Sequence, residues 1–172
     1  MNSILDYYKE GDVGIEIGVL EGELSKRLIT TNPSKLYLLD CWEFQSEGYS
    51  GIDTKYDGCN QPNDVQKRKY ESVCEYFKEY DNVEIIKGFS LEVVDKFDDE
   101  TFDWIYIDAN HNYDSVKADL VAWTPKVKIG GWISGHDWDH PDVKKALLEE
   151  FPNEDITAGI YPPQSWVIKK DR

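Results

Sequence analysis

The stretch that decides the fold is Val13-Gly-Ile-Glu-Ile-Gly-Val-Leu-Glu-Gly-Glu-Leu-Ser25. Its first half, Val13 to Val19, is a short apolar run typical of a buried strand. Two glycines, Gly18 and Gly22, then lead into a helical segment that begins near Ser25. Glycines between a strand and a helix let the backbone approach a ligand at the helix start. The stretch therefore predicts a βα unit with a ligand-binding loop.

Short β-rich runs alternate with helical segments along the rest of the chain, which is typical of βα units around a parallel sheet. The expected strands are 13–19, 36–39, 83–86, 102–107, 132–134, 156–160 and 165–168. The expected helices are 25–31, 64–80, a short helix from Ser90, one with Val116, Leu120 and Trp123 on its inner stripe, and 142–151. Only a short loop containing Pro162-Pro163 separates the last two strands, which favours an antiparallel hairpin. The pattern predicts an α/β fold.

Length and composition narrow the class of protein. The 172 residues suit one domain, spanning 1–172, because single cores usually contain about 100–200 residues. The net charge of −15 opposes binding to a phosphate backbone, so nucleic acid is not an expected partner. The acidic start has no signal-peptide pattern, no apolar run approaches the ~18 residues of a membrane span, and the three cysteines suggest no disulfide framework. We expect a cytoplasmic protein without membrane contact.

One segment interrupts the regular alternation. Residues 43–63 form a polar stretch rich in glycine and asparagine, longer than the ~12–15 residues of ordinary loops. A solvated excursion would have this polarity, but Phe44, Tyr49 and Tyr56 give it more aromatic content than such a linker needs. We therefore expect 43–63 to be a lid or substrate loop.

The charge of the first loop indicates the kind of cofactor. It contains Glu16, Glu21 and Glu23 and has no base before Lys26, so the pyrophosphate of a dinucleotide would meet like charges. This disfavours an NAD-binding oxidoreductase. S-adenosylmethionine has a sulfonium and an ammonium that Glu16 could face, and Asp40 at the end of the next strand suits ribose hydroxyls.

The three histidines follow just two expected strands, in Asp108-Ala-Asn-His111 and His136-Asp137-Trp-Asp-His140. If these strands are neighbours, Asp108 and either His136 or Asp137 can ligate one ion. His136 and Asp137 can both ligate it only if the chain has already left the sheet at residue 136, because successive residues of a strand point to opposite faces. His111 would then stand beside the ion as a general base. The structural alternative makes Asn110 or Asn112 a helix cap and His111 a surface residue, with Asp137 and Asp139 forming a turn.

Several motifs together resemble a known family. They are Glu16-Ile-Gly18-Val-Leu-Glu-Gly22, Leu39-Asp40-Cys-Trp42, Ile107-Asp108-Ala-Asn-His111-Asn-Tyr113 with Val116 and Asp119-Leu120, and Gly130-Gly131 with Gly135-His136-Asp137. Over about 11–150 the chain resembles the class I S-adenosylmethionine-dependent methyltransferases, particularly the small O-methyltransferases that include the macrocin and mycinamicin enzymes. The resemblance implies a Rossmann-like, seven-stranded, mostly parallel sheet with helices on both faces and an antiparallel C-terminal strand.

The resemblance also implies residue roles. Glu16, Gly18 and Gly22 would hold the methionine part of the cofactor, Asp40 the ribose, and Trp42, Phe89 and Ser90 the adenine surroundings. Asp108 would be the first metal ligand and His136 and Asp137 the others, although a histidine at 136 departs from the acids and amides of metal-dependent relatives. His111 matches the position of the catalytic base.

Methyl transfer from S-adenosylmethionine to a hydroxyl of a small molecule or sugar is therefore the expected reaction, assisted by a divalent metal, Mg²⁺ or, because of His136, Mn²⁺. One alternative keeps methyl transfer without the metal, with Asp108 bound to the cofactor and His136 to the substrate. Another is a non-catalytic S-adenosylmethionine-binding protein. Substrate recognition would come from 43–63, from 138–141, or from a partner subunit in a homo-oligomer.

Overall fold

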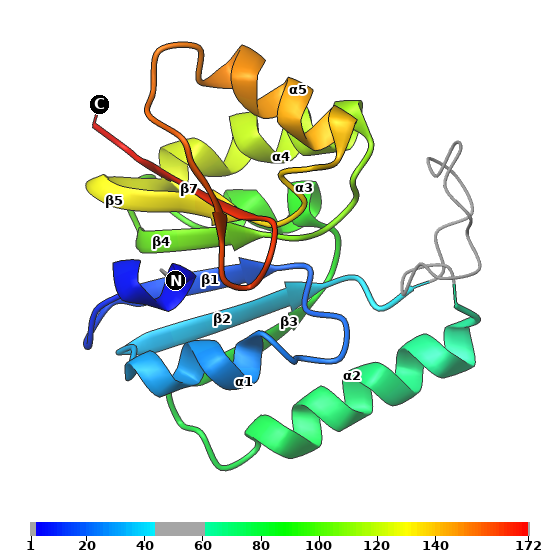
Figure 1. Ribbon diagram of the computed structural model, residues 1–172. Helices are drawn as coiled ribbons and strands as arrows, with labels where there is room; N and C mark the ends of the chain where they lie inside the picture. Colours follow the sequence, from blue (N-terminus) through cyan, green and yellow to red (C-terminus); the bar gives the residue numbers. More distant parts are fainter. Residues whose placement is uncertain (1–2, 44–60, 172) are drawn as a thin grey trace.

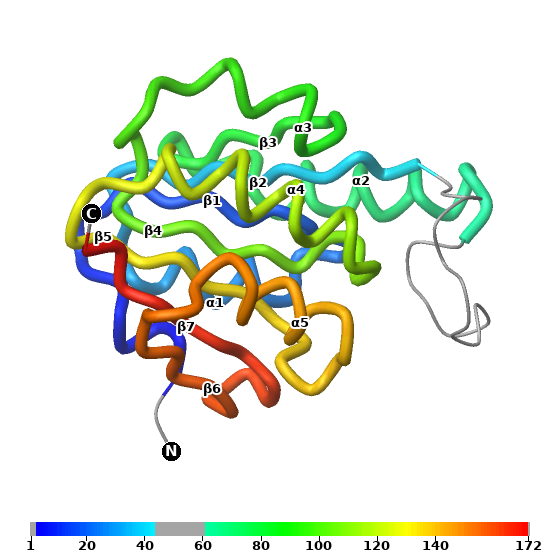
Figure 2. The backbone as a smooth tube through the Cα atoms, turned by 90° about the horizontal axis from the view of Figure 1, so that it is seen from above, coloured from blue at the N-terminus to red at the C-terminus, as the bar shows by residue number. Residues whose placement is uncertain are grey.

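Seven strands form one mixed sheet in the computed structural model, which describes residues 3–43 and 61–171. The strands are β1 (Val13–Ile17), β2 (Lys35–Asp40), β3 (Val83–Lys87), β4 (Phe102–Ile107), β5 (Val127–Gly135), β6 (Thr157–Ile160) and β7 (Ser165–Lys169). Their order, β3-β2-β1-β4-β5-β7-β6, can be followed from top to bottom in Figure 2. β1 to β5 pair in parallel, and β7 runs antiparallel to both β5 and β6. The predicted Rossmann-like sheet and its antiparallel C-terminal strand are confirmed.

Helices cover both faces of this sheet (Figure 1). One face carries α3 (Ser90–Val93), α4 (Tyr113–Trp123) and α5 (Pro141–Glu150), and the other carries α1 (Ser25–Leu28) and α2 (Asn63–Phe77). Single 3-10 turns are η1 (Ile4–Tyr7), η2 (Ile29–Thr31), η4 (Val94–Lys96) and η5 (Thr124–Lys126). No helix among the described residues has the length and apolarity needed to cross a bilayer. Most of the expected substrate loop, 44–60, lies outside the described residues.

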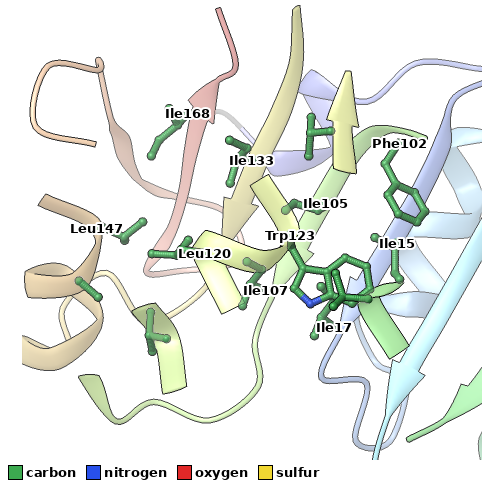
Figure 3. Packing of buried hydrophobic residues seen from close by; sticks show 14 of the residues in the cluster. Ile15, Ile17, Phe102, Ile105, Ile107, Leu120, Trp123, Ile133, Leu147 and Ile168 are labelled. Atoms are coloured by element: carbon green, nitrogen blue, oxygen red, sulfur yellow. The ribbon is translucent and has the colours of Figure 1, made fainter. Parts of the chain in front are cut away.

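The central strands are apolar because both of their faces are buried. On the face of α3 to α5, Ile15 and Ile17 of β1 pack with Ile105 and Ile107 of β4 and with Trp123 of α4 (Figure 3). The opposite face is filled by side chains that alternate with these along the strands, since successive residues of a strand point to opposite sides. These two layers hold the carboxyl ends of the parallel strands at one edge of the sheet.

The structure differs from the sequence-based expectation in β5. The sequence predicts a strand only over 132–134, with residues 128–131 closing the preceding helical unit, but β5 begins at Val127. Gly130 has a φ of +85° and donates to Lys170 O at 2.6 Å, while Lys170 N donates back to Gly131 O at 2.9 Å. The pairing of β5 with β4 shifts register in this region, so the glycines form a bulge within the strand.

Candidate active site

The loop after β1 touches the loop after β4, and only glycine fits at the contact. Gly18 has a φ of +93°, and a Cβ there would lie 1.9 Å from the backbone oxygen of Asp108. Gly18 N donates to Leu39 O at 2.8 Å, and Asp108 N donates to Ile17 O at the same distance. The loop therefore leaves the sheet between β2 and β4. Gly22 is less crowded, because its Cβ would meet Val73 at 3.3 Å.

Asp40 and Trp42 shape this loop from the end of β2. The Asp40 carboxylate accepts hydrogen bonds from the backbone N–H groups of Val19, Leu20 and Trp42, each at 2.8 Å. The Trp42 indole donates to Leu20 O at 2.9 Å and is 2% exposed. Leu20 is thereby held at a φ of 53°, in the left-handed region. The assignments of Asp40 to ribose and of Trp42 to the adenine surroundings stay predictions.

Glu16 lies in the middle of this edge and is 2% exposed. It accepts a hydrogen bond from the hydroxyl of Ser25, the first residue of α1. Burial raises the pKa of Glu16 well above its ordinary value, the Ser25 hydrogen bond opposes this, and the charges of Asp108 and Asp40 add to it. The charges of Asp108 and Asp40 thus repel a charged Glu16, and a cationic ligand would relieve this repulsion.

The segments after β4 and β5 bring together a second group of side chains. Because Ile107 pairs with Gly135, Asp108 and His136 leave the sheet side by side. Asp137 has a φ of 58°, so the chain turns out of the strand direction there. Because the chain has left the strand direction, His136 and Asp137 can face the same site. His136 Nδ1 lies 3.2 Å from Asp137 Oδ2 and 3.8 Å from Asp108 Oδ1.

His111 completes this group. Its Nε2 lies 3.0 Å from Asp137 Oδ2 and 3.4 Å from Asp108 Oδ1. Asn112 accepts a hydrogen bond from Ser115 N at 3.0 Å and caps α4, as the structural alternative predicted for it. Asp108, His111 and His136 also line a small pocket that has Val116, Val143 and Trp166 among its apolar walls.

Two pKa shifts reflect the proximity of these groups. The hydrogen bond to Asp137 raises the pKa of His136 to about 9, against the effect of burial. Burial acts to raise the pKa of Asp137, but His136, His111 and His140 together hold it below its ordinary value. His136 Nε2 donates to Pro163 O at 2.8 Å, so its Nδ1 is the atom that faces Asp108 and Asp137.

The donor set fits a divalent metal ion. Asp108, His111 and Asp137 each offer one ligand atom, and these atoms all lie within 4.8 Å of one another. Carboxylate oxygens and imidazole nitrogens are the donors that Mn²⁺, Fe²⁺ and Zn²⁺ accept, while Mg²⁺ prefers oxygen alone. These three residues include His111, which the sequence analysis predicted as the catalytic base. They do not include His136, which it predicted as a metal ligand and which lies beside Asp137.

Two residues to which the sequence analysis gave no role in the site also contact predicted site residues. Ser25 holds Glu16, and Asp119 of α4 accepts a hydrogen bond from the Ser90 hydroxyl at 2.5 Å. Asp119 is 3% exposed. The sequence could have indicated a role for Asp119, because it lies three residues after Val116 on the apolar stripe of α4, where a buried carboxylate needs a hydrogen-bond partner.

A family model described as "Methyltransferase domain" matches residues 15–138. The chain belongs to the methyltransferase domain family. It is a class I S-adenosylmethionine-dependent methyltransferase, as the motifs of the β1 loop and of the β4 and β5 ends predicted. The matched region contains every predicted site residue.

Solved structures share the fold of this methyltransferase. The O-methyltransferase NovP superposes with a TM-score of 0.68 at 19% identity, over 95% of this chain and 73% of NovP. An rRNA methylase from Streptococcus thermophilus gives 0.62 at 10% identity, over 98% and 92%. Aeropyrum pernix fibrillarin with natively bound S-adenosyl-L-methionine gives 0.58 at 13% identity, over 93% and 66%. No protein of curated function matches the chain in sequence.

Proposed function

We propose that this methyltransferase methylates a hydroxyl oxygen of a small acceptor, such as a sugar or another polyol, with the assistance of a divalent metal ion. The observation that carries the proposal is the convergence of Asp108, His111 and Asp137 beside the cofactor loop. Binding S-adenosylmethionine does not need such a group. Deprotonating a hydroxyl does, because the group combines a proton acceptor with ligands for a Lewis acid.

The cofactor would lie along the edge of the sheet formed by the ends of β4, β1, β2 and β3. S-adenosylmethionine, when bound, supplies an electrophilic methyl group on a sulfonium centre. Glu16, Gly18 and Gly22 would hold the methionine part, and Asp108 would border it. Asp40 would hold the ribose, with Trp42, Phe89 and Ser90 around the adenine. The raised pKa of Glu16 supports a cationic ligand at this place.

Asp108, His136 and Asp137 would hold the metal ion. A divalent ion, when bound, lowers the pKa of a hydroxyl held next to it. His136 suits this role because its Nε2 donates to Pro163 O while Nδ1 faces both carboxylates. Metal-binding histidines usually donate their other ring N–H to such an oxygen. Mg²⁺ and Mn²⁺ are the ions to test first, the second because of the imidazole ligand.

His111 would take the proton from the acceptor hydroxyl. Its Nε2 lies 3.0 Å from Asp137 and 3.4 Å from Asp108, so the imidazolium that forms would be stabilised by two carboxylates. A base in this position typically contributes a factor of about 10²–10⁴ to the rate. The remaining contribution comes from holding the acceptor oxygen in line with the methyl group.

The charge of the chain favours a small acceptor over a polynucleotide. The net charge of −15 leaves few cations to neutralise phosphates, on which nucleic-acid binding largely depends. A hydroxyl-bearing small molecule does not depend on such cations.

Calorimetry and a turnover assay together test the proposal. We expect S-adenosylmethionine and S-adenosylhomocysteine to bind and NAD not to bind, with and without Mg²⁺ or Mn²⁺. A panel of sugars, polyols, catechols and RNA oligonucleotides is then incubated with S-adenosylmethionine, and released S-adenosylhomocysteine is measured by mass spectrometry with and without EDTA. Turnover that EDTA abolishes supports metal-assisted O-methylation. Turnover that EDTA leaves intact excludes the metal, and cofactor binding with turnover only on RNA oligonucleotides excludes the small acceptor.

A further inference from the structure

The chain enters the proposed metal site from β5 through a residue with an uncommon backbone conformation. Asp137 has a φ of 58°, in the left-handed region that residues other than glycine seldom adopt. A residue keeps such a conformation where its surroundings hold the backbone in place. One contact lies within the segment itself, because His140 N donates to Asp137 O at 2.8 Å. The two peptide groups that flank the Asp137 Cα determine its φ and ψ, so their contacts decide where its carboxylate points.

Both of these peptide groups are hydrogen-bonded to the β6–β7 hairpin, residues 157–169. In the peptide before Asp137, the carbonyl of His136 accepts a hydrogen bond from the Trp166 indole at 2.8 Å. In the peptide after it, the N–H of Trp138 donates to Gln164 O at 2.9 Å. The hairpin therefore restrains both backbone dihedral angles of Asp137.

The hairpin also contacts the imidazole beside Asp137. His136 Nε2 donates to Pro163 O at 2.8 Å, which leaves Nδ1 facing the two carboxylates of the site. These contacts are possible because β7 lies next to β5 in the sheet (Figure 2). Trp166 of β7 pairs with Gly135, the last residue of β5, so the hairpin turn reaches the residues that follow β5.

Packing fixes the Trp166 indole in its place. The side chain is 1% exposed and belongs to the core on the face of α3 to α5. A Cβ on Gly135 would lie 2.5 Å from the Trp166 ring, so the glycine lets the indole lie directly against the end of β5. An indole held in this way gives the His136 carbonyl a fixed hydrogen-bond donor.

We propose that the β6–β7 hairpin, through the Trp166 indole, positions Asp137 for binding the metal ion. Trp166 is a positioning residue and not a ligand, and the inference rests on the proposed metal site. Because the peptide before Asp137 is held in advance, the ion does not have to order it, and binding costs less conformational freedom. Removing the partner that orients a metal ligand commonly weakens metal binding by about 10–100-fold.

Trp166→Phe tests the role of the indole N–H, because it removes this donor and keeps an aromatic ring in the core. We expect the dissociation constant for Mn²⁺, measured by electron paramagnetic resonance, to rise about tenfold. The spectrum of bound Mn²⁺ should broaden, since its ligands are less uniformly placed. Calorimetry without metal should give an unchanged dissociation constant for S-adenosylhomocysteine, because Glu16 and Asp40 lie on β1 and β2, away from the hairpin.

Trp123→Phe is the matched control. Trp123 is 0% exposed and belongs to the same core cluster as Trp166, and among the described residues its indole N–H has no hydrogen-bond partner. The same substitution there removes the same volume without removing a hydrogen bond, so Mn²⁺ should bind as it does to the wild-type protein. Equal weakening of Mn²⁺ binding in both variants would assign the effect to packing and overturn the inference.

A second variant tests the hairpin without changing the core. Pro163 is exposed, so Pro163→Gly should fold. Glycine gives the turn that presents its oxygen to His136 more conformational freedom, so Mn²⁺ should bind at least about threefold more weakly. Pro152→Gly changes another exposed proline, in the turn after α5, and should leave Mn²⁺ binding unchanged.

The outcomes separate this inference from the proposed function. Unchanged Mn²⁺ affinity in Trp166→Phe that circular dichroism shows to be folded overturns the inference and leaves the proposed metal site standing. Should Trp166→Phe fail to fold, unchanged affinity in Pro163→Gly overturns it. Failure of the wild-type protein to bind Mn²⁺ at all overturns the proposed metal site, and the inference with it.

Discussion

His111 Nε2 lies 3.0 Å from Asp137 Oδ2, which joins the segment after β4 to the segment after β5. This distance suits a base oriented by a carboxylate, and it also suits two ligands of one ion. The two roles predict different effects of a substitution. Loss of a base lowers only turnover, whereas loss of a ligand also weakens binding of the metal ion.

His111→Ala should lower kcat by a factor of about 10²–10⁴ and leave the dissociation constant for Mn²⁺ within about threefold of the wild-type value. Turnover is followed by release of S-adenosylhomocysteine, and Mn²⁺ binding by electron paramagnetic resonance. Imidazole added to the medium should restore part of the activity. A loss of Mn²⁺ binding together with activity would make His111 a ligand and move the base elsewhere.

Asp137→Asn should weaken Mn²⁺ binding at least tenfold, because it removes a charged ligand atom from the proposed metal site that it forms with Asp108 and His136. Asp139→Asn is the matched control. That residue lies two positions further along the same segment and is exposed, so its variant should bind Mn²⁺ as the wild-type protein does. Equal affinities of the two variants would place the ion away from Asp137.

Glu16→Gln should weaken S-adenosylmethionine binding about tenfold or more without lowering the melting temperature at pH 8. The amide keeps the shape of the side chain and a polar contact to Ser25, but it cannot ionise to face a cationic ligand. Burial, which raises the pKa of Glu16, makes that charge unfavourable when no such ligand is bound. Calorimetry and thermal unfolding measure the two quantities. Unchanged affinity would remove Glu16 from the cofactor site, and a large fall in melting temperature would make its charge structural.

Gly18→Ala should destabilise the fold much more than Gly130→Ala. Both glycines have a positive φ, which costs a residue with a Cβ roughly 1–2 kcal/mol. At Gly130 nothing lies within 4 Å of the added Cβ, whereas at Gly18 it would meet Asp108 O at 1.9 Å. Urea unfolding should therefore show about 1–2 kcal/mol for Gly130→Ala and at least about twice that for Gly18→Ala. Equal losses would contradict close contact between the two loops.

Stability should depend on pH through Asp119. Its pKa is raised from 3.8 to about 6 in the native state, so between these values the native protein binds more protons than the unfolded chain. The free energy of unfolding therefore contains a contribution from Asp119 that falls, by roughly 3 kcal/mol, as pH rises from below 4 to above 6. Urea unfolding of the wild-type protein and Asp119→Asn across this range measures it.

The readout is the difference between the two stability curves. The asparagine variant lacks the titrating group, so the wild-type protein should lose stability relative to the variant as pH rises through this window. Any constant offset from the altered hydrogen bond to Ser90 does not affect this slope. Curves that remain parallel from pH 4 to pH 7 would contradict the raised pKa.

The sequence by itself determined the strands of the sheet and the polar residues at their carboxyl ends. Buried parallel strands must be apolar on both faces, so runs such as 13–19 and 102–107 were recognisable. Ligands bind at the carboxyl ends of such strands, which identified Glu16, Asp40 and Asp108 as the residues to examine. The Gly130-Gly131 pair made the predicted β5 too short, because the sequence analysis placed these glycines at the end of the preceding helical unit and the structure places them in a bulge within the strand.

Only the tertiary structure decided which side chains meet. The contact of His111 with Asp137 depends on β4 and β5 being neighbours in register, which local patterns do not encode. The hydrogen bond from Ser90 to Asp119 likewise depends on how α3 packs against α4. A hydrogen bond or an ion pair forms over a few ångströms, so its existence is decided by packing between segments that the chain order separates.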